Sequence, residues 1–379
     1  MYEVRDVCFA CTTPYQVLGA ISIAKNINSK ADLYIFGMFS DYADLAERIR
    51  QLDIFDHVFA VDGSEFSFLG KVSSTLEAQF GALKQMFFSE KYVGTFLQKD
   101  VLYKQYCSSS RAHVKNLFLH VLQKRNPNTH ITIYDDGLGS YLKQSHVLRT
   151  SKKRAIIETL FGWNLYDPDK IDIQLYLPEI ASLPDELNRC QIRQMPRLDW
   201  NEPYNKKLLK AVFTTGSTET IQERVILFDN VRGDIQRKRL FAGIDECYKE
   251  ILTTLGKDNV ILKPHPRSVE TPDLDLKIIT EAGIPMEAFY ADMADLENKI
   301  LISYNSTATY TPKILFGAEP WVINLHRIIP SSFQEQSESL YSTFKKTYRN
   351  KDKLLAPRTM EELRSMLNNI PEGESNGLV

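Results

Sequence analysis

The fold is decided by the opening stretch, VRDVCFACTTPYQVLGAISIA, residues 4–24. Its first part is an apolar run of β-forming side chains, which predicts a buried strand over residues 4–11. The run stops at Thr12-Thr13-Pro14, and the apolar residues that follow have the spacing of a helix over residues 15–24. A strand that turns directly into a helix is the opening unit of a nucleotide-binding α/β domain.

The same alternation continues along the first half of the chain. Apolar β-type runs predict strands at residues 31–36 and 57–61, with a helix over residues 41–51 between them. Strands that alternate with helices favour a parallel, doubly wound sheet. Residues 66–123 contain long amphipathic stretches, so we interpret them as a helical insertion. A basic run at residues 152–154 is typical of a solvated helix start, with an anion site as the alternative.

The second half repeats the pattern after a polar, proline-containing crossing at residues 183–205. We therefore expect an α/β chain of two Rossmann-like domains with a cleft between them. The N-terminal domain would span residues 1–200 and the C-terminal domain residues 206–357, followed by a helix and tail over residues 358–379. The strands of the second domain are expected at residues 225–228, 259–262, 299–303 and 321–325.

Length and composition limit the functions that the chain can have. At 379 residues, with 43% hydrophobic and 25% charged side chains, it is ordinary globular material that exceeds one typical core. The formal net charge of -2 gives no overall basic field, so we expect no nucleic acid partner. The charged N-terminus and the lack of a long apolar run predict a cytoplasmic protein.

The cysteines give no sign of a disulfide framework or a metal centre. There are 5 of them, an odd number, which argues against a secreted disulfide scaffold. Cys8 and Cys11 have a C-x-x-C spacing, but no second Cys/His pair completes a zinc site. We expect ordinary core thiols and no metal.

The first motif with chemical content is Asp135-Asp136-Gly137. It follows a β-branched run and so lies at the carboxyl end of a strand, the edge where open α/β sheets bind ligands. The pair could hold a divalent cation against a diphosphate, or one carboxylate could be a general base for an attacking hydroxyl. A turn with only a capping role is the structural alternative. Successive side chains on extended backbone point to opposite faces, so only one carboxylate should enter the site.

The second motif is Lys263-Pro264-His265-Pro266, which also follows a strand-like run. The two prolines restrict the backbone around His265, which suits an imidazole that must be held in place. A rigid turn with a surface histidine is the structural alternative. Beside a departing phosphate, a protonated imidazole would reduce the developing charge and could donate a proton.

A third polar stretch, Tyr304-Asn305-Ser306-Thr307, joins an expected strand to a helix expected over residues 309–316. Hydroxyls and backbone N–H groups at a helix start form a ready phosphate site, although either hydroxyl could instead be an N-cap. The chain contains no P-loop and no G-x-G-x-x-G after its first strand, which weakens NTPase and dinucleotide interpretations.

Taken in this order, the three motifs resemble those of the bacterial sialyltransferases. The segment Thr12-Thr13-Pro14-Tyr15-Gln16 is similar to glycosyltransferase family 52 in particular, which makes sialylated lipooligosaccharides and capsules. The resemblance extends from the first strand to about residue 325. It implies a GT-B fold and an inverting reaction without an obligatory metal or other cofactor. The donor would be CMP-sialic acid, and the acceptor a galactose-terminated glycan joined by an α-2,3 linkage.

The resemblance also implies roles for individual residues. Asp135 would be the base that deprotonates the acceptor hydroxyl, with Asp136 as the fallback, and His265 would stabilise the departing phosphate. Other donor contacts would be Lys263, Pro266, Glu287 at the ribose, Tyr304, Asn305, and Ser306 and Thr307 at the phosphate; substrate contacts in the N-terminal loop would be Thr12, Thr13, Gln16 and Gly137. Where many relatives have paired serines this chain has Asn305-Ser306-Thr307, so the register there is uncertain by one residue.

Several alternatives stay open. A glycolipid acceptor would place the protein at the inner face of the membrane, and helices like those of the insertion can mediate a homodimer in the family. A related enzyme could transfer glucose or galactose, act as an epimerase on the same fold, or polymerise sialic acid. A glycan- or nucleotide-binding protein without activity is least favoured, because Asp135 and His265 are both retained and a binder needs no base.

Overall fold

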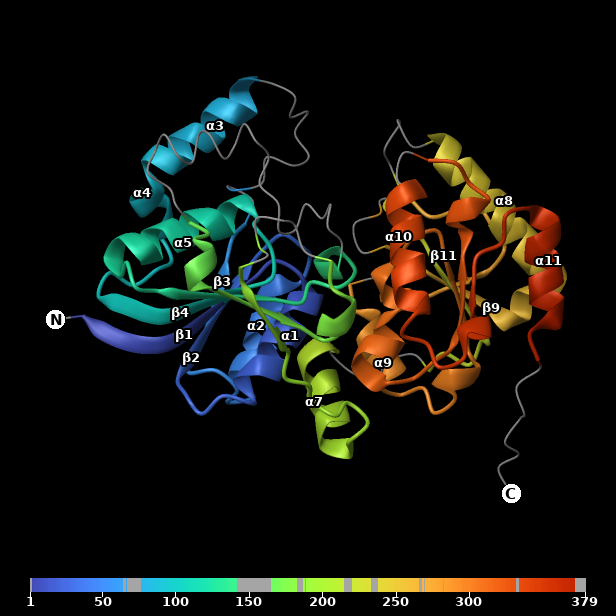
Figure 1. Ribbon diagram of the computed structural model, residues 1–379, viewed down its shortest axis with the longest axis horizontal. Helices are drawn as coiled ribbons and strands as arrows, with labels where there is room; N and C mark the ends of the chain where they lie inside the picture. The colour runs from blue at the N-terminus through green and yellow to red at the C-terminus, as the bar shows by residue number, and fades with distance from the viewer. Residues whose placement is uncertain are drawn as a thin grey trace. The chain divides into compact units, whose positions relative to one another are not determined.

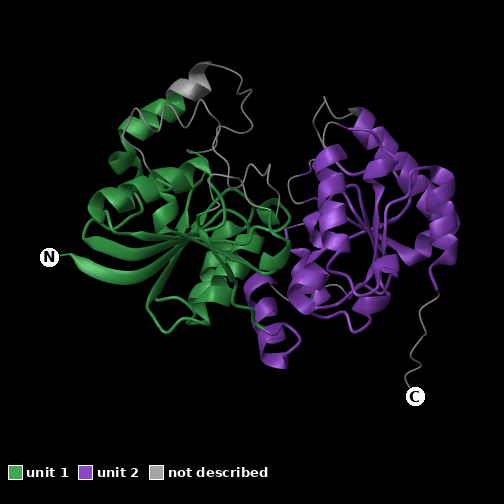
Figure 2. Cartoon of the chain, viewed as in Figure 1, with its two compact units in different colours: residues 1–198 green, residues 199–379 purple. Residues whose placement is uncertain are grey.

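The computed structural model describes residues 2–63, 66, 76–141, 165–182, 187, 189–214, 220–232, 238–265, 268, 270–281, 283–331 and 334–371. The chain divides into two compact units, Met1–Leu198 and Asp199–Val379 (Figure 2). Each unit contains a parallel sheet with helices, so the expected α/β chain with two Rossmann-like domains is confirmed. The basic run at 152–154, Pro266 and the tail after residue 371 lie outside the described residues.

The sheet of the first unit is parallel throughout its described strands, in the order β3-β2-β1-β4-β5-β6-β7 (Figure 1). Inner strands of such a sheet are covered on both faces, which is why β2 is buried at every position. The strand order reverses between β1 and β4, so their carboxyl ends form the topological switch point where ligands bind. The strands are β1 (Glu3–Cys11), β2 (Ala31–Phe36), β3 (His57–Val61), β4 (Val101–Ser108), β5 (His130–Tyr134), β6 (Ile171–Leu175) and β7 (Gln191–Gln194).

The helices of the first unit follow from local signals in the sequence. Helix α1 begins at Pro14, whose fixed φ suits the first helical position, and the Thr13 hydroxyl caps it by accepting from the Gln16 N–H. Helices α3 and α4 pack on α5, which itself packs on β4 (Figure 1). The bounds are α1 (Pro14–Ala24), α2 (Tyr42–Arg50), α3 (Leu76–Phe87), α4 (Ser89–Val93) and α5 (His113–Arg125).

The stretch interpreted as a helical insertion contains a central strand of the sheet as well as helices. Strand β4 lies between β1 and β5 and pairs with both in parallel. Lys104 and Gln105 interrupt its apolar pattern, because that part of the strand is only partly covered, and this hid the strand in the sequence. The consequence concerns function, since the end of β4 forms half of the switch point.

The second unit also has a parallel sheet, in the order β10-β9-β8-β11-β12-β13 over the residues that the structure describes. Its strand order reverses between β8 and β11, which places a second switch point after these strands. Helix α8 packs on α11. The elements are α7 (Pro203–Phe213), β8 (Val225–Phe228), α8 (Lys238–Leu255), β9 (Val260–Lys263), β10 (Lys277–Ile278), α9 (Met286–Tyr290), β11 (Ile300–Ser303), β12 (Trp321–Asn324), α10 (Gln334–Lys345), β13 (Leu354–Leu355) and α11 (Met360–Asn369).

Two segments differ from the expectation in ways that concern the site. The helix expected over residues 309–316 is a 3-10 turn at Thr307–Thr309 followed by a π-helix at Pro312–Phe316. Pro312 lacks the N–H that a continuous α-helix would need there. In the expected crossing, β7 still belongs to the first sheet, and the connection to α7 begins only after it.

A buried carboxylate ties together four neighbouring strands of the first unit. Asp32 on β2 is 1% exposed, and its Oδ2 accepts hydrogen bonds of 2.5 Å from Arg5 Nη1 on β1 and 2.5 Å from the Tyr103 hydroxyl on β4. Its Oδ1 lies 3.0 Å from Nδ1 of His57 on β3. A buried ion pair of this kind is costly to break from one side, because the remaining charge stays buried.

We predict that Asp32→Ala lowers the free energy of unfolding by about 3 kcal/mol, because the Arg5 guanidinium then stays buried without this carboxylate. Urea denaturation followed by circular dichroism measures the loss. The control is Asp6→Ala, which removes an exposed pair with Lys104 at 2.7 Å and should leave the midpoint nearly unchanged. Equal losses in the two variants would show that burial of the Asp32 network does not matter.

Candidate active site

Three polar side chains that follow three different strands converge at the switch point of the first unit. Gln16 follows β1, Lys115 follows β4 and Asp136 follows β5. Gln16 Nε2 donates to Asp136 Oδ1 at 2.8 Å, and Lys115 Nζ donates to Gln16 Oε1 at 2.8 Å. Because these strands all end at the carboxyl edge of one parallel sheet, residues as far apart in the sequence as Gln16 and Asp136 form one cluster.

The orientation of the Gln16 amide is fixed by its surroundings. Its Oε1 accepts from the Thr12 backbone N–H at 2.7 Å, from the Thr12 hydroxyl at 3.0 Å and from Lys115. Three donors at one oxygen require a carbonyl there, so the amide nitrogen must face Asp136. Thr12 and Gln16, two residues expected to contact substrate, therefore position the carboxylate, and Thr13 caps α1.

Asp135 is enclosed and has no solvent exposure. Its Oδ1 accepts from the Gly137 N–H at 2.7 Å, and its Oδ2 accepts from the Tyr176 N–H at 3.2 Å and from the Tyr141 hydroxyl. Burial raises the pKa of the Asp135 carboxyl to about 6, although these three donors favour its charged form. Asp135 therefore holds the β5 and β6 turns together, and a substrate cannot reach it in this structure.

Gly137 makes the turn after the two acids possible. Its φ of 77° lies in the left-handed region, which a residue without Cβ adopts at little cost. The turn places the Gly137 N–H on Asp135 and the Ser140 hydroxyl 2.7 Å from the Asp136 N–H, so Gly137 has a conformational role.

Asp136 differs from Asp135 because it is partly exposed. Burial raises the pKa of its carboxyl, while Lys115, Gln16 and Ser109 act in the opposite direction. Only one of the two adjacent acidic residues keeps exposed surface, in line with the alternation of side chains along extended backbone. The geometry favours Asp136, the fallback of the sequence interpretation, over Asp135 as the residue that meets a substrate.

Lys115 was not singled out in the sequence. It lies in the first turn of α5 without solvent exposure, and it donates a second hydrogen bond to the Ser110 hydroxyl at 3.0 Å. Burial lowers the pKa of its ammonium to about 8, and the Asp136 charge acts in the opposite direction. The signal in the sequence was the serine run 108–110 just before a helix, which went unused because the preceding strand was missed.

In the second unit, neutral polar groups occupy the switch point after β11. The Ser303 hydroxyl accepts from the Ser306 N–H at 3.1 Å, which shapes the turn, and Ser306 begins the 3-10 turn without capping it through its side chain. The Asn305 Oδ1 atom is buried without a hydrogen-bond partner among the described residues. Tyr304 is 2% exposed and its hydroxyl bonds to Ser331, so it anchors the turn. Asn305, Ser306 and Thr307 remain partly exposed.

Lys263 and Glu287, expected at the donor, are both 5% exposed. Lys263 Nζ donates to the Glu281 carbonyl at 2.7 Å and lies 5.4 Å from the centre of the Phe289 ring. Burial lowers the pKa of Lys263 to about 8 and raises that of Glu287, while the opposite charge of each counteracts its partner's shift. Both side chains are therefore buried beneath the turn that follows β9.

His265 follows β9 directly and is partly exposed. Its carbonyl accepts from the Ser268 N–H at 2.9 Å. The Ser268 hydroxyl in turn accepts from the Arg232 N–H at 3.0 Å and donates to the Asn230 carbonyl at 3.1 Å, which ties the β9 turn to the turn after β8. His265 is thus held beside the second switch point, whereas Pro266 lies outside the described residues.

The metal-binding interpretation of the acidic pair does not fit the observed contacts. Both oxygens of Asp135 already accept hydrogen bonds, two of them from backbone N–H groups. Within the described part of the chain, no group of three or more His, Cys, Asp or Glu side chains could hold a metal ion.

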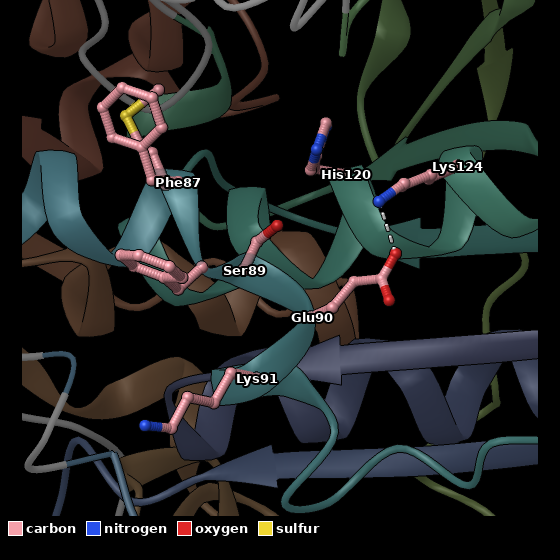
Figure 3. Close-up of a pocket in the computed structure, with 8 residues that line it drawn as sticks. Phe87, Ser89, Glu90, Lys91, His120 and Lys124 are labelled. Carbon is pink, nitrogen blue, oxygen red and sulfur yellow. Dashed lines mark ion pairs between the residues drawn. The ribbon is translucent and has the colours of Figure 1, made fainter.

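A pocket of about 370 Å³ lies among the helices α3, α4 and α5 (Figure 3). Phe87 and Phe88 are 64% and 56% exposed, and Glu90 pairs with Lys124 at 2.6 Å. None of the switch-point residues lines this pocket, so it is distinct from the cluster around Asp136. Its lining residues are Met86, Phe87, Phe88, Ser89, Glu90, Lys91, His120 and Lys124.

The chain matches no protein-family model and no curated protein sequence. Its fold is similar to the UDP-N-acetylglucosamine 2-epimerase from Rickettsia bellii, with 14% identity, a TM-score of 0.46 and coverage of 97% of this chain and 96% of that one. The UDP-GlcNAc 2-epimerase from Neisseria meningitidis, bound to UDP-GlcNAc, has 11% identity, a TM-score of 0.40 and coverage of 97% and 95%. A UDP-forming α,α-trehalose-phosphate synthase from Burkholderia xenovorans has 8% identity, a TM-score of 0.42 and coverage of 97% and 99%.

These comparisons contradict the sialyltransferase resemblance. The similar structures named above are two UDP-N-acetylglucosamine 2-epimerases and a UDP-forming synthase, and no family model matches the chain. Sialic acid transfer for capsule or lipooligosaccharide is therefore wrong as the assigned function, and so are the partners inferred with it, CMP-sialic acid and a galactoside acceptor. Membrane association and a homodimer were expected only because of that family, so these two expectations are withdrawn with it.

Among the described helices, none combines the length and the apolar composition of a membrane span.

We predict that Asp135→Asn and Asp136→Asn differ in stability. An asparagine at 135 leaves at least one of the three donors without an acceptor, which should lower the free energy of unfolding by about 1–3 kcal/mol. An asparagine at 136 keeps an oxygen for Gln16 and loses only the charge that acts on Lys115 through the Gln16 amide, so its loss should be the smaller of the two. Urea denaturation of both variants measures the difference, and a larger loss at position 136 would mean that the roles are reversed.

The same pair of variants tests the pH dependence. The folded-state pKa of Asp135, about 6, is above its ordinary value of 3.8, so the folded state binds this proton more tightly than the unfolded state does. Its contribution to stability is greatest in acid and is lost as the pH rises through about 6. Asp135→Asn should remove this decline from the pH profile of the unfolding free energy, and an unchanged profile would contradict the assignment.

Proposed function

We propose that the protein is an inverting glycosyltransferase that moves a hexose such as glucose or galactose from a nucleotide-activated donor to a hydroxyl acceptor. The observation that carries this proposal is the partly exposed Asp136 carboxylate at the switch point of the first sheet, held by Gln16 near the buried cation of Lys115. A positioned carboxylate at this edge suits the removal of a proton from a hydroxyl.

Asp136 would act on the acceptor. In the proposed step its carboxylate takes the proton of the acceptor hydroxyl while the oxygen attacks the anomeric carbon of the sugar. The bond from that carbon to the nucleotide phosphate breaks, and the phosphate leaves with the bonding electrons. A single displacement of this kind inverts the configuration at the anomeric carbon.

The second unit would hold the nucleotide. Its switch point offers the Ser306 and Thr307 hydroxyls, and the unpartnered Oδ1 of Asn305 can accept from a nucleotide hydroxyl or amino group. His265, held on the neighbouring turn, can donate to the leaving phosphate. The 3-10 turn after β11 is too short for a helix dipole to contribute, so individual donors such as the Ser306 and Thr307 hydroxyls would hold the phosphate.

We predict that Asp136→Asn lowers kcat by about 100-fold to 10,000-fold, the usual contribution of a general base, with nucleotide affinity unchanged. The assay follows nucleotide release from UDP-glucose, UDP-galactose and UDP-N-acetylglucosamine with a panel of sugar acceptors, and calorimetry with UDP reports binding. The control is Asp172→Asn, which changes a partly buried carboxylate on β6 that lies 3.1 Å from Nε2 of His130. Turnover by Asp136→Asn within tenfold of the parent would remove Asp136 as the base.

The same incubations distinguish transfer from epimerisation. In D₂O without an acceptor, exchange of the sugar C2 proton with solvent would indicate an epimerase and would contradict transfer. Acceptor-dependent formation of a glycoside, with no exchange at C2, is the result that the proposal expects.

For the nucleotide site we predict that Ser306→Ala weakens UDP binding roughly tenfold, equivalent to one lost hydrogen bond to a charged group. Isothermal titration calorimetry measures the change. Ser342→Ala, at an exposed position on α10 with a long 3.4 Å contact to Glu338, is the matched control and should bind like the parent. Equal affinity in both variants would show that the β11 turn does not hold the nucleotide.

A further inference from the structure

Lys115 is a buried cation that lacks a direct acidic partner. It has no solvent exposure, and its ammonium donates to two neutral oxygens, Gln16 Oε1 and Ser110 Oγ. Among the described residues no carboxylate forms an ion pair with it within 4.0 Å. Buried charges in proteins are normally paired, so this arrangement calls for an explanation beyond packing.

The position of Lys115 in its helix makes the charge costlier still. Helix α5 begins after Ala112, which provides no side-chain cap, and its first turn contains no acidic residue. The positive end of the helix dipole disfavours a cation in the first turn. An apolar side chain of similar length would avoid both costs.

The nearest compensation is reached through the Gln16 amide. Lys115 binds the oxygen of that amide and Asp136 binds its nitrogen, at 2.8 Å on each side. The two Thr12 donors prevent the amide from turning over. The amide therefore keeps a cation and an anion at a fixed separation, close enough for their charges to interact but without direct contact.

We propose that Lys115 is a positioning residue for the proposed transferase, and that its charge, relayed by the Gln16 amide, keeps the Asp136 carboxylate ionised and oriented toward the acceptor hydroxyl. The inference rests on the proposed function for the identity of the reaction. The link between the two charges is a property of the free protein and can be tested without a substrate.

The other titratable groups that act on this pair do not change the expectation. Burial raises the pKa of the Cys11 thiol to about 11, so it stays neutral over the working range. Burial raises the pKa of Asp135 to about 6, and the adjacent Asp136 charge acts in the same direction. Loss of the Lys115 charge, by substitution or at a pH above its pKa of about 8, should therefore raise the pKa of Asp136.

The kinetic test compares the pH profile of kcat/KM in Lys115→Met, Lys115→Arg and the control Lys124→Met, whose side chain is exposed on the same helix. Lys115→Met should raise the pKa that governs the fall of kcat/KM at low pH by about one unit, the usual effect of losing a nearby opposite charge. Lys115→Arg should restore most of the parent profile. A role in packing alone would lower kcat/KM at every pH and leave this pKa unchanged, and that result would overturn the proposal.

The substrate-free test is a double-mutant cycle of unfolding free energies for Lys115→Met and Asp136→Asn. The two substitutions should be non-additive near neutral pH, where both groups are charged, and additive well above the Lys115 pKa. Additivity at every pH would overturn the proposal even if the enzyme is active. Non-additivity with no sugar transfer would leave the coupling in place and refute the proposed function alone.

Discussion

The hydrogen bond from Gln16 to Asp136 is the interaction on which the site depends. It joins the first strand-to-helix turn of the chain to the turn after β5, across the switch point of the first sheet. The parallel sheet makes this meeting possible, because all its strands end at one edge. The Thr12 donors and Lys115 fix the amide, so the accessible carboxylate has one orientation relative to the sheet.

The two adjacent acids show how environment separates residues of the same type. Asp135 is surrounded by the donors of Gly137, Tyr141 and Tyr176 and has a structural role. Asp136 has one amide donor, a more distant cation and access to solvent. Different surroundings can thus give two neighbouring carboxylates different properties.

Much of the fold could be predicted from the sequence, because apolar runs and turn residues determine strands such as β1, β2 and β8. Strand β4 was missed because Lys104 and Gln105 break its pattern, and Lys115 was missed with it. The choice between Asp135 and Asp136 depends on donors from β6, which local sequence does not reveal. The motifs suggested the wrong family because acidic turns and His-Pro turns fit the edge of any such sheet, whatever its substrate.

In the proposed function Asp136, and not Asp135, is the carboxyl that meets the acceptor. Labelling with a water-soluble carbodiimide and an amine, mapped by mass spectrometry, tests it most directly, because the reagent reaches only accessible carboxyls. We expect label on Asp136, none on Asp135, and protection of Asp136 when donor and acceptor are both bound. Label on Asp135, or label on Asp136 that substrates leave unchanged, would contradict it.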